Sequence, residues 1–306
     1  MQKACRQSGL WLMMVAGLLV TSSIRAKEFL VGQCIPPETR FLLRIDVKAV
    51  YKSSFGQPLL DVIKAKHGMD FQEWLDKQVG VKLNKIDQVW IMGFPRDNTL
   101  LVFKGSFSTT SLKYHFGKQP GVQKERRKGW RFFAGWVDHN KMMAGGLLDT
   151  HTLILGPRQL VERYENYILK KAQPLAPTHP LLKKLNTNID PVVGTLFQPK
   201  QPNTIQDPFL RKVKEAWFAV TFVEDQLTAT ISFEFFSSEE AEKTQRFLHG
   251  LKHLAQNANP QPKRPVKQDF ITHLLLQGEL IRQENMLIIT MDMDTAGFKK
   301  FLLNAP

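Results

Sequence analysis

Two histidines, His249 and His253, stand four residues apart in a segment that is predicted to be helical. This spacing places two imidazoles on one face of a helix, which is the arrangement that a metal site needs. A third ligand is missing nearby, because residues 247–256 contain no acid. A solvated helix face is therefore favoured over a metal site.

Two other polar pairs could support chemistry. Asp292 and Asp294 lie at the end of a predicted strand and could hold a divalent cation or share a proton. Asp294 also fits the N-cap of the helix that follows. Asp138 and His139 are adjacent, and neighbouring side chains of a strand or turn point apart. A helix cap and a polar hairpin turn are favoured, so we predict no catalytic residue, no metal ligand and no cofactor.

The short motifs of common enzyme classes are missing from the sequence. It contains no GxSxG, Walker loop, GxGxxG, HExxH or CxxC. A non-catalytic binding protein is therefore favoured over an enzyme. A hydrolase or other enzyme with dispersed residues stays as the alternative, because catalytic groups can be scattered along a chain.

The segment Lys118–Trp136 has the most unusual local composition. Six cations crowd one predicted loop: Lys118, Lys124, Arg126, Arg127, Lys128 and Arg131. Four aromatic residues follow or interleave with the last of them: Trp130, Phe132, Phe133 and Trp136. Cations beside exposed rings suit an anionic, partly apolar partner, and also single-stranded nucleic acid. The alternative is a solvated loop that leads into a core strand with buried rings.

The elements that must position these residues are helices and strands in alternation. The apolar spacing predicts a strand over 40–47, followed by helices over 57–66 and 70–79. A helix is also predicted over 205–214. Three units of a hairpin followed by a helix are predicted over 89–116, 216–255 and 279–303.

We predict an α+β fold with two similar lobes, each a mainly antiparallel sheet covered by helices. The segment 174–191 is rich in proline and asparagine, which is typical of a linker. The predicted limits are a signal peptide over 1–26, an N-terminal lobe over 27–173, this linker, and a C-terminal lobe over 192–306.

The opening segment Ile35–Val47 (IPPETRFLLRIDV) resembles the start of exported bacterial proteins of unknown function. In those proteins a proline-led segment runs into a strand that ends in Asp, and a helix follows. The hairpin that ends Val102–Phe107 (VFKGSF) is similar to their next element. The resemblance covers about a third of the chain, implies an exported two-lobed α+β protein, and carries over no catalytic residue.

The first residues have the build of a secretory signal peptide. Lys3 and Arg6 precede an apolar run over Leu10–Val20, and Ala26 stands at a plausible cleavage point. The run is shorter than the about 20 residues that a membrane-spanning helix needs. We expect export to the periplasm or beyond the cell, with no transmembrane segment after cleavage; an uncleaved run could act as a short anchor.

The charge of the chain favours anionic partners. The formal net charge is +14 at pH 7, and the chain stays strongly basic without its signal segment. Outside the cytoplasm, anionic lipid, acidic glycan or an envelope protein is expected as the partner, and no nucleic acid. A basic balance that only keeps the protein soluble is the alternative explanation.

Cysteine usage predicts a fold without an intramolecular disulfide. Cys5 leaves with the signal segment and Cys34 remains alone. An unpaired thiol in an exported protein is either buried or available for a bridge to another chain. An assembly component of the envelope is therefore a further alternative function, and the sequence leaves the oligomeric state open.

Overall fold

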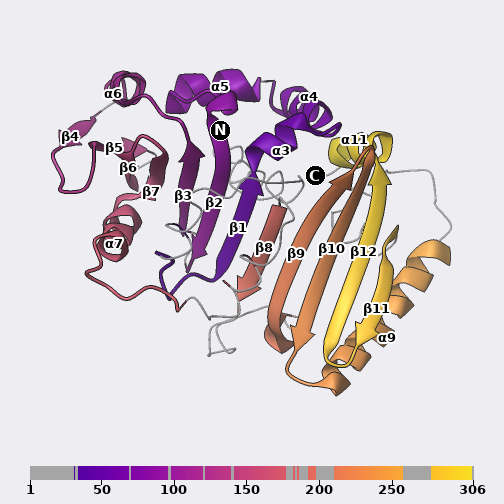
Figure 1. Cartoon of the computed structure of the whole chain (residues 1–306). Coiled ribbons are helices and arrows are strands. Elements are labelled where there is room, and N and C mark those ends of the chain that lie inside the picture. Colours follow the sequence, from indigo (N-terminus) through magenta and orange to yellow (C-terminus); the bar gives the residue numbers. More distant parts are fainter. Residues whose placement is uncertain are drawn as a thin grey trace.

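The strands of the described residues form one open sheet of 12 strands, in which every neighbouring pair is antiparallel. Figure 1 shows this sheet running across the computed structural model. The α+β class and the antiparallel pairing predicted from the sequence are confirmed. The structure describes residues 31, 34–68, 70–95, 98–119, 121–138, 141–176, 182, 185, 192–197, 210–257 and 277–304.

The N-terminal half contributes seven of the strands. They are β1 (Phe41–Asp46), β2 (Ile86–Phe94), β3 (Asn98–Gly105), β4 (Gln123–Glu125), β5 (Phe132–Asp138), β6 (Lys141–Asp149) and β7 (Thr152–Pro157). Its helical elements are α3 (Val47–Lys52), α4 (Gly56–His67), α5 (Phe71–Val79), a 3-10 turn η1 (Leu83–Lys85), α6 (Thr109–Phe116) and α7 (Arg158–Ile168). The predicted helices over 57–66 and 70–79 are α4 and α5. Asp70 caps α5 by accepting hydrogen bonds from the backbone of Gln72 and Glu73.

The C-terminal half contributes the other five strands. They are β8 (Val192–Phe197), β9 (Val213–Val223), β10 (Gln226–Phe235), β11 (Glu279–Gln283) and β12 (Met286–Asp294). Its helical elements are a 3-10 turn η3 (Leu210–Lys212), α9 (Ser238–Asn257) and α11 (Thr295–Asn304). The predicted helix over 205–214 is wrong at its end, because β9 begins at Val213; residues 205–209 lie outside the described part of the chain.

The strand order repeats one pattern outward from the middle of the sheet: β11-β12-β10-β9-β8-β1-β2-β3-β7-β6-β5-β4. In each half three successive antiparallel strands are followed by a helix and then by further strands, the last of which pairs with the third strand. Thus β7 pairs with β3, and β12 pairs with β10. The three hairpin-then-helix units predicted from the sequence are formed by β2–β3–α6, β9–β10–α9 and β11–β12–α11.

The two halves share this sheet and part of the core, instead of forming one sheet each. Strand β1 pairs with β8, with Leu43 opposite Gly194. The buried ring of Phe55, the residue that precedes α4, stacks on Phe222 of β9 at 4.5 Å and meets Phe298 of α11 edge-on at 5.4 Å. Contacts between aromatic rings of this kind contribute about 0.5–1.5 kcal/mol beyond burial of their area.

Five residues of the predicted linker are described, namely 174–176, 182 and 185, and the last two are buried. Leu182 and Leu185 pack in the same apolar cluster as α7. The buried Arg44 of β1 donates a hydrogen bond to the backbone oxygen of Leu185 at 2.9 Å. At these two positions the segment between the halves is therefore part of the core.

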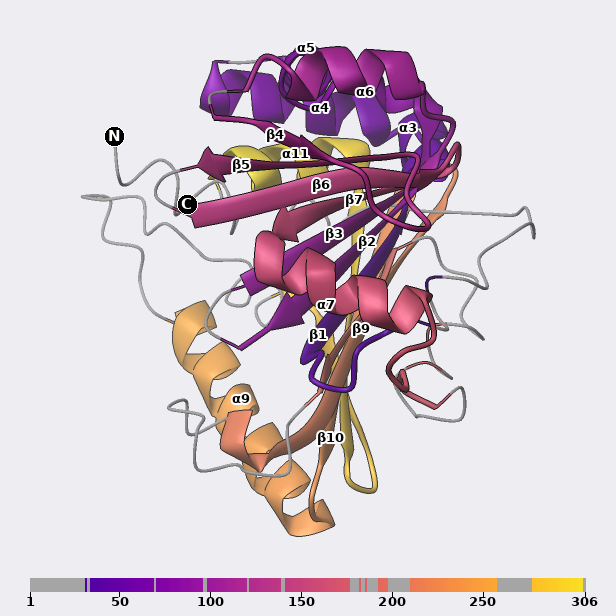
Figure 2. The same cartoon turned by 90° about the vertical axis from the view of Figure 1, so that its left-hand side faces the viewer.

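The helices lie on both faces of the sheet, and side-chain alternation along the strands assigns them. Trp90 of β2 packs in the cluster of α7, whereas its neighbour Ile91 packs on the opposite face with α4 and α11. Leu287 of β12 packs under α9, and Ile289, two residues on, packs with α11. Helix α9 therefore shares a face with α11, and among the described helices only α7 covers the other face, as Figure 2 shows.

Candidate functional site

The basic segment lies at the β4 end of the sheet, between α6 and α7 (Figure 1). Strand β4 pairs only with β5, Glu125 lying opposite Phe133. The chain reverses between the two strands, and Gly129 takes a left-handed backbone angle, φ = 85°, that a side chain would strain. This turn brings the loop over 126–131 against α7.

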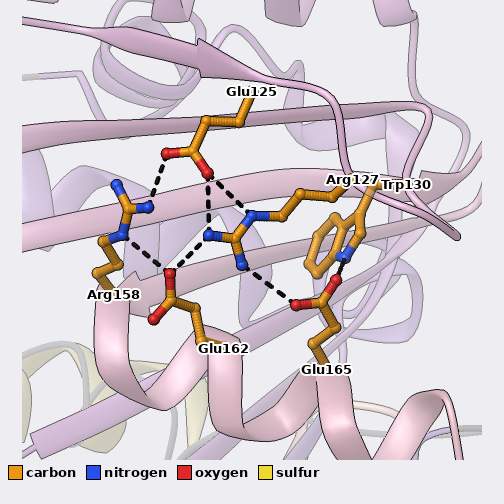
Figure 3. A network of polar contacts seen from close by, with 6 residues as sticks. All are labelled: Glu125, Arg127, Trp130, Arg158, Glu162 and Glu165. Atoms are coloured by element: carbon orange, nitrogen blue, oxygen red, sulfur yellow. Dashed lines mark hydrogen bonds and ion pairs between the residues drawn. The ribbon is translucent and has the colours of Figure 1, made fainter.

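Arg127 does not face solvent but lies in a network of ion pairs, which Figure 3 shows. Its guanidinium donates to Glu125 Oε2 from Nε at 3.0 Å and from Nη2 at 2.9 Å. The same Nη2 donates to Glu162 Oε1 at 2.6 Å, and Nη1 donates to Glu165 Oε2 at 3.1 Å. One arginine of the loop thus joins the edge strand β4 to helix α7.

A second arginine closes the network. Arg158, at the start of α7, contacts Glu125 Oε1 at 2.7 Å and donates to Glu162 Oε1 at 2.9 Å. The arginine–glutamate network therefore consists of Arg127, Arg158, Glu125, Glu162 and Glu165. Its two cations form ion pairs with three carboxylates. The acidic side chains next to the loop are therefore paired within the network.

Charge pairing shifts the pKa values in the network in the directions expected for ion pairs. Burial tends to raise the pKa of Glu162, but hydrogen bonds from Arg127 and Arg158 outweigh it and lower the pKa. Burial tends to lower the pKa of Arg127, but its bonds to Glu162 and Glu125 raise it instead. Both groups are therefore held in their charged forms.

Two aromatic residues of the segment belong to the core, and the two tryptophans are half-buried against it. Phe132 and Phe133 are buried. Trp130 meets Phe133 edge-on at 5.1 Å and donates from Nε1 to Glu165 Oε1 at 2.8 Å. Trp136 packs on Phe116 of α6 at 5.1 Å. The buried-ring alternative is therefore the one that the structure adopts, and these rings do not form an exposed interface.

Five cations of the segment are exposed: Lys118, Lys124, Arg126, Lys128 and Arg131. Lys118 Nζ lies 4.0 Å from the centre of the exposed Tyr114 ring, and Lys124 lies beside Gly117 at the end of α6. None of the five forms an ion pair with a carboxylate of the described residues. Of the six cations predicted as a binding site, the structure exposes five and leaves Arg127 half-buried in the network.

Two further cations lie near the loop and were missed in the sequence. Lys170 and Lys171 are exposed just beyond α7. The preceding residue, Leu169, contacts the loop, because a Cβ at Gly129 would lie 3.2 Å from its Cδ2. A pair of lysines at the end of a predicted helix was the available signal. We call the seven exposed cations the basic end: Lys118, Lys124, Arg126, Lys128, Arg131, Lys170 and Lys171.

The paired polar residues of the sequence have ordinary places. His249 and His253 are exposed on α9. Asp294 Oδ1 accepts a hydrogen bond from the backbone of Gly297 at 2.6 Å and so caps α11. Asp292 accepts from the hydroxyl of Thr228. Asp138 is the last residue of β5, and His139 lies outside the described residues.

Buried and metal-binding groups offer no second site in the described part of the chain. It contains no cluster of three or more His, Cys, Asp or Glu side chains suited to a metal ion. Cys34 is buried, and burial raises the pKa of its thiol, against the opposing charges of Lys104 and Lys170. No helix in the described ranges has the length and apolar character to cross a membrane.

Comparison with known proteins identifies the fold but no family. No protein-family model and no curated protein matches the chain. The chain is similar to TP0453 in its crystal form III, with 12% identity and a TM-score of 0.53 over 92% of this chain and 98% of that one. It is similar to crystal form IV with 10% identity and a TM-score of 0.51, over 89% and 95% of the two chains.

Proposed function

We propose that the protein is a non-catalytic binding protein of the cell envelope, exported from the cytoplasm, whose basic end binds an anionic lipid surface. One observation carries the proposal. Seven exposed cations gather around β4, α6 and the end of α7, while the nearby acids Glu125, Glu162 and Glu165 are taken up by Arg127 and Arg158.

The local charge supports a partner that carries many phosphates. A cation near an anionic bilayer contributes about 1 kcal/mol to binding, and the field decays within a Debye length of about 8–10 Å. Several cations side by side therefore give usable affinity where one alone gives little. Binding through this surface rests mainly on charge, because the aromatic rings of the segment pack on the core, and the exposed ring beside these cations is that of Tyr114.

The test is co-sedimentation of the chain with phosphatidylglycerol vesicles at low salt, with phosphatidylcholine vesicles as the neutral comparison. The double variant Arg126→Ser/Lys128→Ser removes two exposed cations and leaves Arg127 in its network. It should bind about 10- to 30-fold more weakly, at about 1 kcal/mol for each cation. The matched control Lys64→Ser/Lys299→Ser removes two exposed cations of α4 and α11 and should change the affinity less than about threefold.

Three outcomes would overturn the proposal. The chain could fail to bind phosphatidylglycerol vesicles at low salt, it could bind neutral vesicles equally well, or the control pair could weaken binding as much as the loop pair. The last result would mean that net charge, and not the basic end, attracts the vesicle. Binding of a soluble acidic glycan in place of vesicles would also reject a lipid surface as the partner.

A further inference from the structure

Helix α9, at the β11 end of the sheet, leaves three large apolar side chains in solvent. Phe247, Leu251 and Leu254 are 62%, 40% and 68% exposed. On the side toward the sheet, Ala241 and Leu248 are buried against Phe235 and Leu287. We call Phe247, Leu251 and Leu254 the apolar stripe.

The apolar arc of α9 is wider than the sheet can cover. Residues 241 and 248 lie on one line along the helix, and residues 247, 251 and 254 lie on a line next to it, at spacings of four and three. Gly250 lies between the residues of the stripe, and a Cβ added there would meet nothing within 4 Å. The spacing of the stripe and this open position suit the close approach of another helix.

We propose that the apolar stripe of α9 packs antiparallel against the same stripe of a second copy of this chain. The stripe is self-complementary. With a two-fold axis near Gly250 and Leu251, Phe247 of each copy faces Leu254 of the other, and Leu251 faces itself. An interface of this kind goes beyond the lipid binding proposed for the basic end, and it uses the opposite end of the sheet.

The charges of α9 suit an antiparallel pair. Its first turn carries Glu239 and Glu240, whereas residues 247–257 contain no acid. About an axis near Gly250 and Leu251 the two helices overlap over residues 244–257, which contain no acid, so the acidic first turns lie outside the contact and no carboxylate is buried in it. The backbone dipoles of the two antiparallel helices oppose favourably. The exposed pairs Glu239–Lys243 and Glu242–Arg246 lie along the helix and leave the stripe itself apolar.

The exposed area predicts a weak dimer. At about 200 Å² for a whole phenylalanine or leucine side chain, the stripe exposes about 300 Å² of apolar surface, which is at the size of a functional patch. A stable interface buries about 800 Å² on each partner, and the area that one pair of helices would bury is smaller than this. We therefore expect a dissociation constant on the order of tens of micromolar.

Sedimentation velocity of the chain between about 1 and about 500 µM tests the proposal, because a dimer of this strength forms within that range. Leu251→Lys and Leu251→Glu each place two like charges at the two-fold axis and should keep the chain monomeric. An equal mixture of the two variants places opposite charges there and should restore the dimer. His249→Lys, on the polar side of α9, is the control and should dimerise like the unchanged chain.

The thermal unfolding of each variant is measured alongside. Leu251 is 40% exposed, so each substitution should lower the melting temperature by no more than about 4 °C if the stripe is free in the monomer. A chain that stays monomeric at about 500 µM would overturn the proposal. So would a mixture of the two variants that fails to associate, or a larger drop in melting temperature, which would mean that the same chain covers the stripe.

Discussion

At the β4 end of the sheet the aromatic side chains of residues 130–136 pack on the core and the cations are exposed. At the β11 end three apolar side chains are exposed and the charges are paired along α9. Both ends are covered by a helix, α7 at one and α9 at the other. Figure 2 shows the two helices on different sides of the sheet. The two ends therefore offer two different kinds of contact surface on one fold.

The difference arises from how much apolar surface each helix brings to its strands. Helix α7 buries Leu160, Val161 and Tyr164 together, and its polar side is tied to the loop by the arginine–glutamate network. Helix α9 buries one apolar line and leaves the adjacent line exposed. A helix whose apolar residues are all covered has a structural role. A helix with a line of exposed apolar residues has a face that a partner can cover.

The largest expected effect on stability comes from disrupting the arginine–glutamate network. Arg127→Met keeps an unbranched side chain but removes the guanidinium, which lies 4.1 Å from the centre of the Phe133 ring, and leaves Glu125, Glu162 and Glu165 with one cation among them. We expect a loss of about 2–3 kcal/mol in the free energy of unfolding, measured by urea titration. Arg126→Met, at the exposed neighbouring position, should change it by less than about 0.5 kcal/mol. Equal losses in the two variants would show that Arg127 is not a structural residue.

A smaller effect is expected at Trp130, which joins the loop to α7. Trp130→Phe keeps a ring against Phe133 and removes the hydrogen bond to Glu165 Oε1. A hydrogen bond to a charged acceptor contributes about 1.5 kcal/mol, so urea unfolding should shift by that amount. The stability loss caused by Trp130→Phe should differ between the unchanged chain and the Arg127→Met variant, because both side chains bind Glu165. Strict additivity would contradict a shared network.

The smallest effect is a pH dependence carried by Glu162. Its pKa in the folded chain lies below the usual 4.5, so its ion pairs stabilise the fold above that pH and are lost as the pH falls through the folded pKa. Solvent screens this partly exposed carboxylate, so Glu162→Gln should cost at most about 1 kcal/mol at pH 7. The cost should shrink as the pH falls below 4.5 and should be absent once Glu162 is protonated in the folded chain. A cost that persists in acid would be a packing effect and not an electrostatic one.

Local patterns in the sequence predict the elements and the position of the basic surface. Asp70 and the apolar spacing after it predict α5, and the crowding of cations predicts the region around β4. The separate role of Arg127 was not predictable from these patterns, because its partners Glu162 and Glu165 lie 35 and 38 residues away along the chain. Alternation alone does not say which of three consecutive cations turns inward.

Long-range pairing accounts for the other differences. Periodicity describes one strand at a time and does not show that β1 and β8 join two halves into one sheet. The sequence of α9 likewise shows a wide apolar arc, which by itself favours complete burial. How much of that arc the sheet covers depends on the positions of Phe235 and Leu287, so the exposed stripe emerges only in the folded chain.

The most direct test of the account is the affinity of the chain for phosphatidylglycerol vesicles as sodium chloride is raised from about 50 to about 500 mM. If exposed cations make the contact, the affinity for the vesicles should fall more than about tenfold over this range, because salt screens the charges. Self-association through α9, followed in the same buffers, should change less than about twofold, because the apolar stripe carries no charge. Vesicle binding that does not weaken with salt would contradict the assignment of the charged and apolar contacts to the two ends of the sheet.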